Sequence, residues 1–147
     1  AFWFLFYTEL SSSKDETLAA LAAKSLKEVK YHLRHSQNWL IRLGDGTEES
    51  NKKVQKALNN LWQYTGELFE IDEVDTNLIK IGIGIDNNSL KSEWNKIVNS
   101  ALKKAKLNRP EDNYMATGGK KGIHTEHLGF LLAEMQFLQR AYPDAKW

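Results

Sequence analysis

The sequence has 147 residues, a formal net charge of +1 and no cysteine. A chain of this length can form one domain with its own core, and the near balance of charge argues against nucleic acid or an anionic membrane as a partner. The lack of cysteine excludes disulfides, thiolate metal sites and a cysteine nucleophile, and it is compatible with a cytoplasmic protein.

The first ten residues, AFWFLFYTEL, form an apolar run with no charge before Glu9. A signal peptide requires a basic leader and a membrane-spanning helix requires about 20 apolar residues, so the run matches neither. We interpret it as a buried helix that the chain enters part-way along, and we expect the sequence to be N-terminally truncated.

A second helix is expected from about Ser13 to about Leu43, because serines and acidic residues at its start suit an N-cap and a first turn. Its apolar residues recur at spacings of three and four and predict a core-facing stripe. The members of that stripe are Ala22, Leu26, Val29, Leu33, Leu40 and Leu43, with Ser36 in a polar gap. Gly44 is expected to end this helix, and Thr47 to cap a third helix that runs to about Phe69.

The segment from Glu70 to Asn88 is expected to connect two helices. Its IKIGIGIDNN stretch has Gly82 and Gly84 but lacks the third glycine and the strand–turn–helix setting of a nucleotide-binding loop. Ser89 is then expected to cap a further helix. The apolar side of that helix consists of Leu90, Trp94, Ile97, Val98, Ala101, Leu102 and Ala105.

A long loop, LNRPEDNYMATGGKKGI, precedes the last predicted helix, which ends at Pro143. The apolar positions of this helix are Leu128, Leu131, Leu132, Met135 and Leu138. Every predicted element is helical, so the fold class is all-α and the expected architecture is a helical bundle.

The histidines carry the candidate chemistry. His32 shares a flank of the second helix with Glu28 and Trp39, and His35 lies further round the helix. On the last helix, His127 and Glu134 occupy a similar flank. His and Glu on two facing helices are the ligand types of a carboxylate-bridged metal site in a four-helix bundle. These five residues are therefore the candidate ligands of a degenerate metal site.

The spacing of these residues does not match the usual di-iron pattern. Di-iron bundles take Glu-x-x-His from each of two helices, whereas here Glu28 is followed at that position by Tyr31, and Glu126 by Gly129. The ligand set is incomplete unless other helices complete it. This favours hydrogen-bonded or interface roles for the histidines over iron binding, and we predict no catalytic residue and no resident metal in this chain.

Three stretches are specific enough to be compared with a known family: KSLKEVKYHLRHSQNWLIRLGDGTEES, LWQYTGELF and MATGGKKGIHTEHLGFLLAEMQFLQRAYPDAKW. They resemble the PaaC family, which provides one of the subunits of phenylacetyl-CoA epoxidase. The resemblance extends over almost the whole chain and is weakest from Ile79 to Asn108.

The resemblance implies a ferritin-like helical bundle, as one domain over residues 1–147, and a place in a bacterial mono-oxygenase complex. In that family the complex converts phenylacetyl-CoA to its ring-1,2-epoxide with dioxygen. Reducing equivalents come from a reductase component with FAD and an iron–sulfur cluster. The di-iron centre belongs to a paralogous protein, the catalytic di-iron subunit, and the PaaC chain is its structural partner.

Relative to the family, the chain resembles only the C-terminal part, lacking the first helical pair. A four-helix bundle that lacks core helices exposes apolar surface, so we expect self-association, with exchange of helices between two chains as one form.

The substrate implied by the family gives the GGKKG loop a candidate role. Accessible backbone amides at glycines, together with the charges of Lys120 and Lys121, suit a phosphate. These lysines or Arg109 are therefore candidate contacts to the coenzyme A phosphates or to a partner subunit. A solvated loop or a loop that docks on the partner is the favoured alternative.

Two functional classes follow. The leading one is a non-catalytic subunit that positions a di-iron oxygenase partner in the cytoplasm. The alternative is a metal-binding ferritin-like oxidase, in which the five candidate ligands bind iron after self-association. The first requires a partner chain, and the second requires iron.

Overall fold

The computed structural model describes residues 1–146, which contain helices and no β-strand. The six α-helices of this part are α1 (Phe2–Leu10), α2 (Glu16–Gly44), α3 (Glu48–Leu61), α4 (Glu73–Lys80), α5 (Lys91–Lys104) and α6 (Glu126–Ala141). The prediction of an all-α fold is confirmed. The chain divides into two compact units, residues 1–116 and residues 117–147.

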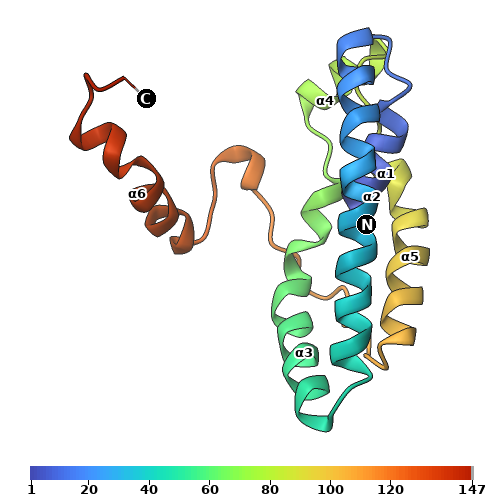
Figure 1. Ribbon diagram of the computed structural model, residues 1–147. Coiled ribbons are helices and arrows are strands. Elements are labelled where there is room, and N and C mark those ends of the chain that lie inside the picture. The colour runs from blue at the N-terminus through green and yellow to red at the C-terminus, as the bar shows by residue number, and fades with distance from the viewer. Residues whose placement is uncertain (147) are drawn as a thin grey trace. The chain divides into compact units, whose positions relative to one another are not determined.

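The first unit is organised around the long helix α2. A short turn joins α2 to α3, so the two helices run antiparallel, and α1 and α5 also pack against α2 (Figure 1). The end of α2 approaches the end of α5 closely, because a Cβ atom added to Gly44 would lie 2.3 Å from the backbone oxygen of Ala105. Asn51 on α3 donates a 2.6 Å hydrogen bond to the Gly44 carbonyl and holds the same corner.

The core of the first unit is aromatic. The ring centroids of Phe2 and Phe69 are 5.8 Å apart, those of Phe69 and Trp94 are 5.3 Å apart, and those of Trp94 and Trp62 are 5.8 Å apart. These rings come from α1, α5 and the two 3₁₀ turns η1 (Trp62–Tyr64) and η2 (Gly66–Phe69). The apolar side predicted for the helix after Ser89 faces this core, since its members are buried or packed against it.

The observed start of α2 and the burial of its apolar stripe agree in most respects with the predictions made from the sequence. Asp15 caps the helix by accepting a 2.9 Å hydrogen bond from the Leu18 amide, so α2 begins later than Ser13. Ser13 instead donates to the Ile83 carbonyl at 2.8 Å. Ala22 is buried and the next members of the stripe are half-buried, but Leu43 is 42% exposed. The stripe leaves the core at the last turn, where Gly44 makes the close approach to α5.

The prediction that the third helix continues to Phe69 is wrong beyond Leu61. Thr47 caps α3 as expected, with a 3.2 Å hydrogen bond from the Ser50 amide, but α3 ends at Leu61 and the 3₁₀ turns follow. These 3₁₀ turns contact the loop around Met115. The Ala116 amide donates to the Gln63 carbonyl at 2.9 Å, and a Cβ atom on Gly66 would lie 2.9 Å from Cγ of Met115.

The connection predicted from Glu70 to Asn88 contains the short helix α4. Asp72 caps it with a complete capping box. The carboxylate of each of Asp72 and Asp75 accepts a hydrogen bond from the backbone amide of the other. Gly82 follows with φ of +78°, a conformation that suits glycine, and the amides of Ile83 and Gly84 both donate to the Leu78 carbonyl at 3.0 Å. The glycines thus close the end of α4.

The predicted cap at Ser89 is also wrong. Residues 87–90 form the 3₁₀ turn η3 (Asn87–Leu90), whose cap is Asp86, and α5 starts directly after Leu90. The Ser89 hydroxyl donates to the Asp86 carbonyl at 2.6 Å. Asp86 supplies the capping acceptor because it precedes the turn.

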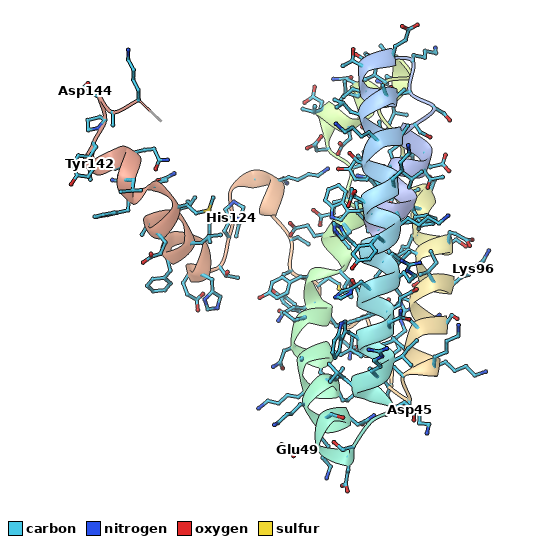
Figure 2. All side chains as sticks on the ribbon, viewed as in Figure 1. Asp45, Glu49, Lys96, His124, Tyr142 and Asp144 are labelled. Atoms are coloured by element: carbon cyan, nitrogen blue, oxygen red, sulfur yellow. The ribbon has the colours of Figure 1, made fainter. Side chains whose placement is uncertain are left out.

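The second unit consists of the 3₁₀ turn η4 (Gly119–Lys121) and α6. Figure 2 shows His124 before α6 and Tyr142 after it. The helix spans the predicted apolar positions and ends before Pro143 as expected. Several of its large apolar side chains are exposed, namely Phe130, Leu131, Leu132, Met135, Phe137 and Leu138. The prediction of one domain over residues 1–147 stays a prediction.

Candidate functional site

The three candidate ligands on α2 have exposed side chains. Glu28, His32 and His35 lie on the surface of the first unit. The ring of His35 lies 5.9 Å from that of Tyr31, nearly parallel to it, and 6.4 Å from that of Trp39. The environment of His35 is therefore an aromatic surface.

The other two candidate ligands belong to the second unit. His127 and Glu134 are exposed on α6, and Nε2 of His127 lies 4.0 Å from a carboxylate oxygen of Glu126. Since both side chains of that pair are more than three-quarters exposed, water screens the interaction strongly. The five predicted ligands come from two separate units, and a joint metal site stays a prediction.

Acidic and histidine side chains do not gather into a ligand set within residues 1–146: no group of three or more there could hold a metal ion. The Glu-x-x-His spacing with which a di-iron bundle brings carboxylates and histidines to a shared position does not occur in the sequence.

Arg109 makes several contacts within the first unit. Its Nη1 atom donates to Oδ1 of Asn95 and to Oδ1 of Asn99, both at 2.8 Å, and its guanidinium carbon lies 4.9 Å from the ring centroid of Trp62. Asp112 accepts a 2.7 Å hydrogen bond from the Trp62 indole and lies 3.5 Å from Nη2 of Arg109. These contacts fasten the loop after α5 onto the core.

The GGKKG loop forms a turn of its own. Gly118 and Gly122 have φ of +99° and +80°, and they flank η4. The Lys121 amide donates to the Gly118 carbonyl at 2.8 Å, and the Ile123 amide donates to the same carbonyl at 3.0 Å. Two backbone amides that could bind a phosphate are thus used inside the turn, while the Lys120 and Lys121 side chains are exposed. A phosphate contact by these lysines stays a prediction.

An apolar groove lies along α2 and α5. It has a volume of about 250 Å³ and is lined mainly by Leu33, Leu40, Ile97, Val98 and Ala101, with Ser36 also at its wall. The polar gap that Ser36 makes in the α2 stripe therefore lies at the groove. Sequence periodicity identified the two helix faces but gave no sign that they leave a groove between them.

An exposed aromatic surface on α2 was missed by the sequence reasoning. Tyr31 is 52% exposed and Trp39 is 49% exposed, with His35 between them. The spacing of four residues, which places side chains on one helix face, was the available signal.

Within residues 1–146, the pKa is shifted at the Ala1 amino group and at Lys96, which are not predicted site residues. Burial lowers the pKa of the Ala1 amino group. The pKa of Lys96 is raised, chiefly by its 2.8 Å hydrogen bond to Glu93 and also by the charge of that carboxylate. Lys96 points away from the bundle into solvent (Figure 2).

None of the helices in residues 1–146 is both long enough and apolar enough to cross a membrane.

Comparison with known proteins gives consistent results. The family model described as phenylacetic acid catabolic protein matches residues 1–147. Over 141 residues, 96% of this chain, the sequence is 50% identical to the C subunit of 1,2-phenylacetyl-CoA epoxidase from Escherichia coli (strain K12). The chain spans 57% of the length of that relative. The predicted resemblance and the ferritin-like helical fold that it implied are confirmed. The chain belongs to the family of phenylacetic acid catabolic proteins.

Proposed function

We propose that the chain is the structural, non-catalytic subunit of a multicomponent mono-oxygenase that epoxidises the ring of phenylacetyl-CoA in phenylacetate catabolism. The observation that carries this proposal is the 50% identity, across 96% of the chain, with one subunit of the E. coli epoxidase. Its partner is the catalytic di-iron subunit, and the complex works in the cytoplasm.

The division of labour is supported by the chemistry of the residues. The chain lacks the Glu-x-x-His spacing that supplies ligands in di-iron bundles, and His35 lies between two aromatic rings. In this proposal the partner's di-iron centre supplies oxygen activation, and a reductase with FAD and an iron–sulfur cluster supplies electrons. The contribution of this chain is a rigid helical surface that positions the partner.

The aromatic core suits this supporting role. Trp62, Phe69 and Trp94 tie α5 to the 3₁₀ turns, and Arg109 ties the following loop to the same rings. Buried rings in mutual contact resist deformation, so the outer faces of α2 and α3 are presented to a partner from a fixed frame.

Reconstitution tests the proposal. The purified chain, the catalytic di-iron subunit and the reductase are combined in all pairs and as a trio, and the phenylacetyl-CoA epoxide is quantified by mass spectrometry. We expect no epoxide from the chain with the reductase, and a large increase when the chain is added to the other two proteins. Unchanged turnover of the di-iron subunit on addition of the chain would contradict the structural role.

Metal analysis separates the alternative function. Iron, manganese and zinc are measured in protein from iron-supplemented medium, for the native chain and for a His32→Ala/His35→Ala variant. We expect equal, substoichiometric metal in both. About two irons per chain or per dimer, lost in the variant, would instead establish a metal-binding ferritin-like oxidase.

Self-association is part of the proposal for the isolated chain. The large exposed side chains of α6, such as Phe130, Met135 and Phe137, support it, because exposed apolar surface promotes association. Sedimentation velocity at micromolar concentration should detect a dimer or a larger species. A compact monomer over the whole concentration range would contradict it.

Contact of the loop with the coenzyme A phosphates is a further part of the proposal. The candidates are Arg109, Lys120 and Lys121, and the two lysines have exposed side chains. A Lys120→Glu/Lys121→Glu variant should weaken binding of the thioester to the assembled complex if the contact exists. Unchanged affinity would remove it.

A further inference from the structure

The outer face of α2 carries a continuous ridge of side chains. We define the α2 ridge as Tyr31, Arg34, His35, Trp39, Arg42 and Leu43. Four of these residues are spaced by four, so they follow one another along one side of the helix. The ring of His35 lies 5.9 Å from that of Tyr31 and 6.4 Å from that of Trp39, and the three rings form a ladder.

Two arginines cover the ends of this ladder. The guanidinium carbon of Arg34 lies 5.7 Å from the ring centroid of Tyr31, and that of Arg42 lies 5.6 Å from the ring centroid of Trp39. Contacts between a cation and an aromatic face hold the arginine side chains along the ridge without neutralising their charge. The ridge is therefore both apolar and positively charged.

Exposure of this surface is unusual for its residue types. Tyr31 is 52% exposed, Trp39 is 49% exposed and Leu43 is 42% exposed, while Trp62 and Trp94 of the same unit are buried. Aromatic residues and arginine are the types most enriched at protein interfaces and among the residues that dominate their binding energy.

Charge indicates what kind of surface the ridge fits. From residue 24 to residue 42, α2 contains five basic residues and one acidic residue, Glu28. A second copy of this chain pairing ridge to ridge would bring these like charges together, which disfavours a symmetric contact. An acidic partner instead gains from the same field, which speeds encounter and fixes orientation.

We propose that the α2 ridge is the docking surface for an acidic, partly apolar helix face of a different protein subunit. The exposed rings of Tyr31 and Trp39 insert between the partner's side chains, and Arg34 and Arg42 pair with its carboxylates. This inference rests on the proposed function, which supplies the partner to be tested, the catalytic di-iron subunit.

Binding measurements with two ridge variants test the inference. The dissociation constant for the di-iron subunit is measured at low and high salt for the native chain, Tyr31→Ala/Trp39→Ala and Arg34→Glu/Arg42→Glu. We expect each variant to bind at least about tenfold more weakly, and the charge-reversed variant to lose most of the salt dependence. Because all four side chains are exposed, circular dichroism should show native helix content in both variants.

Matched controls lie elsewhere on the first unit. Tyr114→Ala removes a ring that is 70% exposed, and Lys103→Glu/Lys104→Glu reverses two exposed charges at the end of α5. Both controls should bind the di-iron subunit within about twofold of the native chain if the ridge is specific.

The outcomes separate the two proposals. If the di-iron subunit binds the native chain and the ridge variants equally, the inference is overturned and the proposed function stands. If it does not bind the native chain, both are overturned. If the ridge variants lose self-association in sedimentation and keep their affinity for the di-iron subunit, the ridge joins two copies of this chain and the inference is likewise overturned.

Discussion

Helices α5 and α6 are of similar length and both carry many apolar residues, yet they have different environments. In α5, Trp94, Ala101 and Leu102 are buried in the first unit. In α6, Phe130 and Phe137 are 70% and 65% exposed, and the structure buries none of its residues. The more apolar of the two helices is therefore the one whose side chains are not buried within its own unit.

The difference shows that an apolar face predicts a need for a partner and does not identify one. Helix α5 meets rings from two other parts of its unit, Trp62 and Phe69. Helix α6 has leucines on one side and phenylalanines on the other, which is typical of a helix buried in a larger assembly. The following substitutions test how far the two regions differ in energetic role.

The largest effect is expected when a buried ring of α5 is removed. Trp94→Ala takes away a 6% exposed side chain in contact with two rings and should lower the free energy of unfolding by about 3 to 5 kcal/mol. Phe137→Ala on α6 should change it by less than about 0.5 kcal/mol. Urea unfolding followed by circular dichroism measures both. Equal losses would show that α6 is as tightly packed as α5.

Glycine substitutions sharpen the same comparison. Gly44→Ala places a Cβ atom 2.3 Å from the Ala105 backbone oxygen, so α2 and α5 must separate at a cost of about 1 to 3 kcal/mol. Gly129→Ala on α6 meets nothing within 4 Å and should favour the helix by about 0.5 to 1 kcal/mol. Thermal unfolding of the two variants should shift in opposite directions. An unchanged unfolding temperature for Gly44→Ala would mean that α2 and α5 can move apart there at little cost in stability.

Removal of the carboxylate under Arg109 should have an intermediate effect. Asp112→Ala leaves the Trp62 indole without its 2.7 Å acceptor and should cost about 1 to 3 kcal/mol. Its neighbour Asn113, whose side chain is exposed, provides the control, and Asn113→Ala should cost less than about 0.5 kcal/mol. Urea titration monitored by tryptophan fluorescence reports on the affected ring directly. Similar urea midpoints for the two variants would argue against a stabilising contact between Asp112 and Trp62.

The smallest effect is expected at helix caps. Thr47 accepts a hydrogen bond from the Ser50 amide at the start of α3, so Thr47→Ala should cost about 1 kcal/mol. Thr125 occupies the same position before α6 without a capping hydrogen bond from its side chain, and Thr125→Ala should be nearly neutral. Chemical denaturation of both variants measures the difference. A larger loss at Thr125 would reverse the expected order of the two caps.

Local chemistry made several helix ends predictable. Thr47 caps α3 as expected, and the C-terminal boundary of α6 precedes Pro143. Such signals act through hydrogen bonds and backbone angles within a few residues, and they are therefore present in the sequence itself. The extension of α3 to Phe69 failed because the 3₁₀ turns there are held by Ala116 and Met115, about 50 residues further along the chain.

Candidate site residues were harder to interpret than boundaries. Arg109 was identified as a cation in a long loop, but its contacts with Asn95 and Asn99 required knowledge of where the loop lies. The ladder of Tyr31, His35 and Trp39 follows from spacing alone, whereas the exposure of its rings depends on which side of α2 the other helices cover.

The all-α class, the apolar sides of the helices and the family could be read from the amino-acid sequence, because they depend on local periodicity and on long specific motifs. Packing in three dimensions was needed to show that α5 joins the core, that α6 exposes its apolar side chains, and that Trp62 bonds to Asp112. The reason is physical. Burial and long-range hydrogen bonds depend on which two segments of the chain come into contact. The apolar pattern of a single helix is compatible with many partners, and only packing in the folded protein selects one of them.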